Sequence, residues 1–122
     1  MTRARLGLGR TGEALAAEHL GALGFEIAAR NYRCPAGEID LVTRRSGTWV
    51  FVEVRTRRGR AFGTPEESVT PRKRAHLIAA AQDYLQEHAL IDVPWRIDFV
   101  AVELSPQGQL LRVDVIENAV TG

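Results

Sequence analysis

Cysteine and lysine are nearly absent from this 122-residue chain, which has one of each, Cys34 and Lys73. A single cysteine excludes an internal disulfide and argues against a zinc site built from cysteine thiolates. Because disulfides belong to oxidising compartments, the lone cysteine favours a reducing one, most simply the cytoplasm. Arginine supplies all the other cationic side chains, so Lys73 is a position of interest.

Long apolar runs are also missing from the chain. No segment approaches the roughly 18 to 20 apolar residues of a membrane span, and Glu13 and Glu18 interrupt the start of the chain before a signal-peptide core forms. Internal repeats, low-complexity segments and linkers are absent as well. With 45% hydrophobic and 25% charged residues, the composition is that of an ordinary soluble globular protein, and the length suits one domain spanning residues 1–122.

The charges are unevenly distributed along the chain, although the net charge is only +1. Residues 1–74 hold fourteen cationic and eight anionic side chains, a net charge of +6, whereas residues 75–122 hold two cationic and seven anionic ones, a net charge of −5. The first part could therefore present a basic surface to phosphates. The alternative is that the two parts form solvated faces of opposite sign.

Hydrophobic periodicity predicts seven elements in the order helix, three strands, helix, two strands. The expected helices span residues 11–23 and 71–88, and the expected strands span residues 25–32, 37–42, 48–57, 95–104 and 110–116. Residues 1–9 and 118–122 are expected to be flexible. A helix between the third and fourth strands favours a parallel crossover there, so we expect an α/β fold with a mixed sheet of about five strands flanked by helices.

Each expected helix has recognisable end signals and an apolar stripe. Thr11 and Thr70 are the expected N-caps, and Pro71 occupies the first position of the second helix. In the first helix, the expected buried stripe consists of Leu15, Ala16, Leu20 and Leu23. Glu13 lies in its first turn, where the ordinary role of a glutamate is to offset the helix dipole by about 0.3–1 kcal/mol.

The two central strands, joined by a turn at Ser46 and Gly47, should form a hairpin that carries an unusual set of charges. Because residues two apart share a face of a strand, pairing of the two strands lets Asp40 and Glu53 meet with Arg55 beside them. Two carboxylates and a cation at the end of an otherwise apolar hairpin suggest a site. The alternative is a set of cross-strand ion pairs, worth about 0.2–1 kcal/mol each.

Basic residues gather after the hairpin and at the start of the second helix. The candidate nucleic-acid-binding residues are Arg57, Arg58, Arg60, Arg72 and Arg74. Arginines in a loop can grip phosphates bidentately, although such loops are also commonly just solvated. Cations in the first turn of a helix oppose its dipole, so an anionic ligand or neighbouring carboxylates are expected to compensate.

The hairpin strands, GEIDLV and VFVEVRTR, resemble the core of the PD-(D/E)xK nucleases. In that superfamily an Asp on one strand and an (Asp/Glu)-x-Lys on the next bind a divalent metal. Asp40 matches the first element, and Glu53-Val54-Arg55 matches the second. Nearly the whole chain, from GRTGEALAAEHL through FGTPEESVTPRKR to WRIDFVAV, more closely resembles the YraN-type family of small bacterial endonuclease-like proteins.

The resemblance implies a restriction-endonuclease-like core and a Mg²⁺- or Mn²⁺-dependent endonuclease that hydrolyses phosphodiester bonds in DNA, with branched or damaged DNA as substrate. It implies metal ligands at Asp40, Glu53 and the Val54 carbonyl. Glu13 matches in order the helical glutamate of archaeal Holliday-junction resolvases, and it would ligate the metal directly or through water. Resolvase-like relatives act as dimers, which implies a homodimer. Without metal, the adjacent Asp40 and Glu53 should include at least one carboxyl group of raised pKa.

One position departs from the superfamily pattern, because Arg55 stands where the lysine is expected. Arginine stays charged and accepts no proton, so Arg55 would act by stabilising the negative charge of the phosphate. Lys73 could instead bring its ammonium into the site from the second helix. Two functions therefore remain: a metal-dependent endonuclease with Asp40, Glu53, Arg55 and Lys73 as catalytic residues, or a non-catalytic nucleic-acid-binding or protein-interaction module that retains the fold.

Overall fold

A computed structural model describes residues 2–59 and 69–120 of the chain, and the side chains of residues 11–59 and 69–119. The elements are α1 (Thr2–Ala22), β1 (Glu26–Cys34), β2 (Gly37–Arg45), β3 (Thr48–Arg58), α2 (Pro71–Glu87), β4 (Trp95–Leu104) and β5 (Leu110–Val120). This is the order expected from the sequence. Within the described residues, neither helix has both the length and the apolar character that crossing a membrane requires.

The five strands form one mixed sheet in the order β1-β2-β3-β4-β5. β3 and β4 are parallel, and the chain crosses between them through α2, as the sequence predicts. The other neighbouring strands are antiparallel. The arrangement is consistent with a restriction-endonuclease-like fold.

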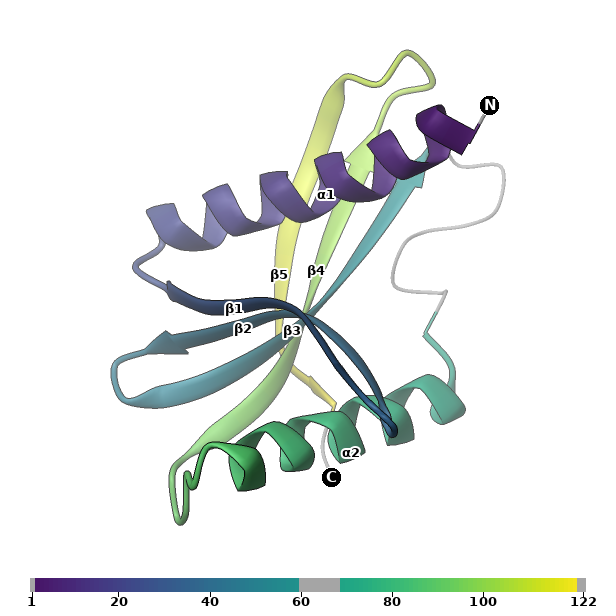
Figure 1. Cartoon of the computed structure of the whole chain (residues 1–122). Coiled ribbons are helices and arrows are strands. Elements are labelled where there is room, and N and C mark those ends of the chain that lie inside the picture. The colour runs from purple at the N-terminus through teal and green to yellow at the C-terminus, as the bar shows by residue number, and fades with distance from the viewer. Residues whose placement is uncertain (1, 60–68, 121–122) are drawn as a thin grey trace.

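The two helices lie on opposite sides of the sheet (Figure 1). The alternation along β3 explains why, since Val50 and Val52 pack with Ala16 and Leu20 of α1, whereas Phe51 packs under α2. β4 is buried from its third residue to its last, because helices cover both of its faces.

The first helix is longer than the sequence suggests, and its buried stripe is shifted. α1 begins at Thr2, so the expectations of a flexible segment at residues 1–9 and of an N-cap at Thr11 are wrong for the described residues. Glycine costs a helix about 1 kcal/mol relative to alanine, which packing can override, and Gly12 is buried against β3. Leu23 is 44% exposed rather than buried, since the helix ends at Ala22.

The last strand is also longer than expected, because β5 continues to Val120 rather than ending near residue 116. Its final residues pair with the beginning of β4, where Val120 lies opposite Ile97. The fully buried Asp98 holds this end together by accepting hydrogen bonds from Arg96 Nε at 3.0 Å and from the Asn118 backbone N–H at 2.8 Å. The expected flexible tail is thus wrong for residues 118–120, and residues 121–122 lie outside the described residues.

The second helix begins as the sequence predicts and is anchored to the sheet by aromatic residues. Thr70 caps α2, and its Oγ1 accepts a hydrogen bond from the Lys73 backbone N–H at 3.1 Å. Tyr32 of β1 donates a hydrogen bond to Asp83 of the helix. The neighbouring Tyr84 meets the Tyr32 ring edge-on, with ring centroids 5.0 Å apart. These contacts fix the position of α2, and therefore of Lys73, relative to the sheet.

Candidate functional site

The candidate site lies where β2 and β3 separate. Their pairing runs from Arg45↔Thr48 to Leu41↔Val52 and stops there. Beyond that point β2 leaves β3 and approaches α2, where a Cβ placed on Gly37 would lie 3.4 Å from the Cβ of His76. The residues that follow the last pair are Asp40 on β2 and Glu53 on β3, so both carboxylates lie at the opening between the two strands.

Asp40 is tied to the backbone of the neighbouring strand. Its Oδ2 accepts a hydrogen bond from the Val54 N–H at 2.8 Å, replacing the carbonyl that a continued strand pair would supply. Because the N–H and C=O of one strand residue point to the same side, the Val54 carbonyl also faces the opening. Asp40 and the Val54 carbonyl therefore both lie at the opening. This is the proximity needed for the metal ligands that the resemblance to the PD-(D/E)xK nucleases implies.

Glu53 lies at the centre of the charged groups, with 3% of its surface exposed. Its Oε2 is 3.2 Å from Lys73 Nζ of α2 and 3.4 Å from Nη2 of Arg55 on its own strand. Glu53 is therefore a neighbouring carboxylate of the kind expected to compensate the positive charges in the first turn of α2. The four residues predicted to be catalytic, which are Asp40, Glu53, Arg55 and Lys73, all meet at this point.

Burial and the neighbouring Asp40 raise the pKa of Glu53 to about 8. Lys73 and Arg55 act in the opposite direction but do not offset those two effects. Glu53 is therefore mostly protonated at neutral pH when no further cation is present. The expectation that one of two adjacent carboxyl groups has a raised pKa is confirmed.

Glu13 reaches the same site from α1. Burial, followed by the negative charges of Asp40 and Glu38, raises the pKa of Glu13, and a hydrogen bond with Asp40 acts in the same direction. The approach depends on Gly12, because a Cβ there would lie 2.0 Å from Thr56 Oγ1. The sequence analysis overlooked Gly12, although a glycine beside a candidate ligand in a helix is a signal of close packing.

The carboxylates suit a hard divalent cation, with one restriction. Mg²⁺ is commonly held by one or two carboxylates together with waters and phosphate oxygens, and Asp40 and Glu53 provide such a pair. As the side chains stand, no three His, Cys, Asp or Glu residues of the described ranges form a metal-binding group. The geometry thus fits a cation held mainly by two carboxylates. The hydrogen bond from a backbone amide to Asp40 and the burial of Glu53 favour a metal site over the alternative of cross-strand ion pairs.

The predicted nucleic-acid-binding arginines form no single cluster in the structure. Arg57 is half-buried on β3, where its Nη1 donates to the Thr56 carbonyl at 3.2 Å and its buried Nε has no partner among the described residues. Arg58 is exposed at the end of β3, and Arg72 and Arg74 are exposed at the start of α2. Arg60 lies outside the described residues. Arg57, Arg55 and Glu53 alternate along β3, so they share one face of the strand.

Comparison with known proteins places this site in a family. A model of the uncharacterised protein family UPF0102 matches residues 12–102. A UPF0102 protein of Dehalococcoides mccartyi is 50% identical over 111 residues, which are 91% of this chain and 90% of that protein. A UPF0102 protein of Roseiflexus castenholzii is 49% identical over 121 residues, 98% of each chain. A third, from Moorella thermoacetica, is 47% identical over 119 residues, 98% of this chain and 99% of that protein.

Proposed function

The chain belongs to the uncharacterised protein family UPF0102, and since that name assigns no activity, we propose a function from the site itself. The function is hydrolysis of phosphodiester bonds in DNA by a Mg²⁺- or Mn²⁺-dependent endonuclease of the PD-(D/E)xK type, whose core the hairpin strands resemble. Branched or damaged DNA is the proposed substrate, and the cytoplasm is the proposed location.

One observation carries the proposal: a buried carboxyl group, Glu53, is held beside Asp40 at the opening between two strands. Burial and Asp40 raise the pKa of Glu53 to about 8. Ionising two adjacent carboxyl groups destabilises the fold, because their negative charges repel each other, unless a cation binds between them. A divalent cation relieves this cost, because it favours the ionised form of both.

The metal would be held by Asp40 and Glu53, with the Val54 carbonyl at the same opening and Glu13 reaching it through Asp40. When bound, Mg²⁺ or Mn²⁺ supplies neutralisation of the phosphate charge and lowers the pKa of a coordinated water. Asp40 is held in place by its hydrogen bond from Val54 N–H, 2.8 Å long. That bond orients the carboxylate before any ligand arrives, which reduces the ordering needed on binding.

Arg55 and Lys73, the two cations beside Glu53, differ in the chemistry that they can perform. Arg55 remains charged and donates hydrogen bonds in a planar fork, so it stabilises the negative charge that develops on the phosphate. Lys73 can lose a proton and carries its amine on a flexible chain. Since its Nζ is 3.2 Å from Glu53 Oε2, it stands where it can orient an attacking water. We therefore assign to Lys73 the role that the superfamily gives to the lysine at the position of Arg55.

DNA would be bound by exposed cations on the two elements that carry Glu53 and Lys73, which are β3 and α2. Arg58, Arg72 and Arg74 are exposed at the end of β3 and the start of α2, and Arg57 shares the strand face of Glu53. Contacts of this kind position the phosphate backbone without reading base sequence. The proposal therefore includes an affinity for DNA that falls steeply with salt concentration.

The experiment is cleavage of linear, nicked, flapped and four-way DNA with Mg²⁺ or Mn²⁺. The wild type is compared with Asp40→Asn, Glu53→Gln and Lys73→Met. Glu26→Gln is the matched control, because Glu26 is an exposed carboxylate on β1 that pairs with Arg44. Metal-dependent cleavage that the three site variants abolish and the control retains is the expected result. Cleavage that survives Asp40→Asn and Glu53→Gln contradicts the proposal.

The second candidate function, a nucleic-acid-binding module without turnover, is favoured by one observation. Lys73 Nζ and Arg55 Nη2 already lie 3.2 and 3.4 Å from Glu53 Oε2, so this carboxyl group has cationic partners in the absence of a metal. Such a module would bind DNA without cleaving any member of the panel, and its affinity would be indifferent to Asp40→Asn. Its binding would instead weaken in Arg72→Ala and Arg74→Ala, which remove exposed cations at the start of α2.

A further inference from the structure

The two edges of the sheet are formed by β1 and β5. β1 has exposed charged residues at Glu26, Arg30 and Arg33, and its pairing is interrupted by an irregularity between Ile27 and Ala29. Such features are how natural proteins prevent edge strands from pairing with other chains. The pairing of β5 with β4 has two irregularities, at the positions of Ile97/Phe99 and Glu103/Leu104, and between them it is regular from Arg112 to Ile116. The outer edge of β5 pairs with no other strand in the described part of the chain.

Large apolar side chains are exposed at the start of β5. Leu110 is 49% exposed and the adjacent Leu111 is 65% exposed. Four large hydrophobic residues are this exposed among those described, and the other two are Leu23 and Ile91. Leu23 directly follows Ala22, which lies across from β5 at the end of α1. Two adjacent exposed leucines at a sheet edge, Leu110 and Leu111, are typical of an interface.

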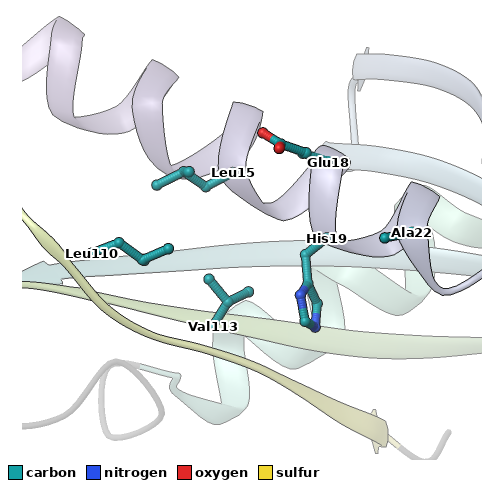
Figure 2. A pocket seen from close by; sticks show the side chains of 6 residues that line it. All are labelled: Leu15, Glu18, His19, Ala22, Leu110 and Val113. Carbon is teal, nitrogen blue, oxygen red and sulfur yellow. The ribbon is translucent and has the colours of Figure 1, made fainter.

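A cavity of about 240 Å³ lies between α1 and the same part of β5. Its lining residues are Leu15, Glu18, His19, Ala22, Leu110 and Val113. Figure 2 shows His19 pointing from α1 toward β5, with Leu110 and Val113 facing the helix across the gap. The sheet edge and the helix therefore do not close on each other here, which leaves apolar surface for another polypeptide to cover.

The charge pattern of β5 indicates which polypeptide fits. Arg112 and Asp114 flank Val113, and Arg112 Nη1 lies 2.7 Å from Asp114 Oδ2 on the same face. If a second copy pairs antiparallel with Val113 opposite Val113, each Arg112 faces the Asp114 of the other copy. Pairing centred on residue 112 or 114 would instead bring like charges together, which is destabilising. The charges on the β5 edge therefore complement those of a second copy in the register centred on Val113, as a two-fold symmetric interface requires.

We propose that β5 is the dimer interface of this protein, where two copies join their sheets edge to edge in antiparallel pairing centred on Val113. The partner is a second copy of this chain. Its β5 covers the exposed Leu110 and Leu111 and closes the side of the cavity under α1. This proposal rests on β5 and α1 alone, so it stands or fails independently of the nuclease activity.

The first test is the mass of the full-length protein in solution, measured by sedimentation velocity over a concentration series. We expect twice the chain mass of 13.5 kDa. Asp114→Lys should raise the dimer dissociation constant by at least about tenfold, because it places lysine opposite Arg112 at two symmetric positions. Ile91→Lys is the matched control, since Ile91 is 78% exposed outside the sheet, and it should leave the mass unchanged.

The second test is a crosslink that identifies the register. In a Cys34→Ser background, Val113→Cys should form an interchain disulfide on oxidation, because directly opposed strand residues lie within disulfide reach. Leu111→Cys is the control, since residues 111 of the two copies would be separated by four positions and beyond that reach. Circular dichroism verifies that each variant is folded.

Three results would overturn the proposal. The first is a monomeric wild type at every concentration, which would leave the β5 edge to a strand of another protein. The second is a dimer whose dissociation constant is unchanged by Asp114→Lys. The third is a folded Val113→Cys variant that crosslinks no faster than Leu111→Cys, because a dimer would then use another surface or register.

Discussion

Replacing Glu53 by glutamine should stabilise the metal-free protein at alkaline pH, although the change removes two ion pairs. Glu53 is 3% exposed, and burial together with Asp40 raises its pKa from 4.5 to about 8. The ion pairs with Lys73 and Arg55 lower this pKa but leave it far above the ordinary value. Glutamine keeps the shape of the side chain and cannot ionise, so it avoids the cost of burying the charge.

The magnitude follows from the pKa difference between the folded and unfolded states. Below pH 4.5 the carboxyl group of residue 53 is protonated in both states, so the wild type has no penalty there. Between pH 4.5 and about 8 the unfolded state releases a proton that the folded state retains, and stability falls by about 1.4 kcal/mol per pH unit. The full interval gives an upper limit of about 5 kcal/mol at alkaline pH.

The assay is urea unfolding of wild type and Glu53→Gln in the presence of EDTA, at about pH 5 and about pH 9. The variant should resemble the wild type at the lower pH and exceed it by a few kcal/mol at the higher one. Glu26→Gln is the control, because the Glu26 side chain is 73% exposed. An exposed ion pair contributes about 0–1 kcal/mol, so this variant should show a small and similar effect at both pH values.

A Glu53→Gln variant that is less stable than the wild type by the same amount at both pH values would refute the reasoning. Glu53 would then be ionised in the folded, metal-free protein, and its ion pairs would outweigh burial. A second readout is Mg²⁺ itself. At alkaline pH the cation should stabilise the wild type, since it favours the ionised carboxyl group, and it should have little effect on the variant.

The remaining predictions concern packing and hydrogen bonds. Gly12→Ala should destabilise the fold by about 1–3 kcal/mol in thermal unfolding, because the new Cβ would lie 2.0 Å from Thr56 Oγ1 and 3.1 Å from Thr56 Cβ. Gly21→Ala, at a helical position with open space, should instead stabilise it by up to about 1 kcal/mol; equal effects would contradict the close approach at Gly12. Tyr32→Phe should cost about 1 kcal/mol in urea unfolding, because it removes the hydroxyl that donates to Asp83. An unchanged stability would mean that water replaces this bond at no cost.

The sequence predicts most of the fold because the strands follow simple patterns. The alternation of Val50, Phe51 and Val52 assigns the two faces of β3, and Thr70-Pro71 marks the start of α2 within one residue. The start of α1 at Thr2 was not predicted, because residues 1–9 were expected to be flexible. Tertiary packing explains why the helix includes Gly12. At this position α1 lies so close to β3 that the Cβ of a larger residue would clash with Thr56.

The residue types of the site could be predicted, but their grouping depends on three-dimensional structure. The hairpin register brings Asp40 and Glu53 to the first positions beyond the last strand pair, Leu41↔Val52, and the spacing of the two strands indicates this proximity. The ion pair between Glu53 and Lys73 joins residues twenty positions apart, and it exists because the crossover between β3 and β4 brings the first turn of α2 beside the middle of β3. The contact of Glu13 with Asp40 likewise depends on how closely α1 approaches the sheet, a distance that no sequence pattern encodes.

The hydrogen bond between Val54 N–H and Asp40 Oδ2 makes one backbone amide a spectroscopic probe of the site. A bond from an amide to a carboxylate is shorter and stronger than one to a neutral carbonyl, and it depends on the charge that the carboxylate carries. Any cation that binds Asp40 draws electron density away from this acceptor and weakens the bond. The Val54 proton resonance should therefore move upfield in step with occupancy, which makes ligand binding visible by NMR without a substrate, a label or any turnover.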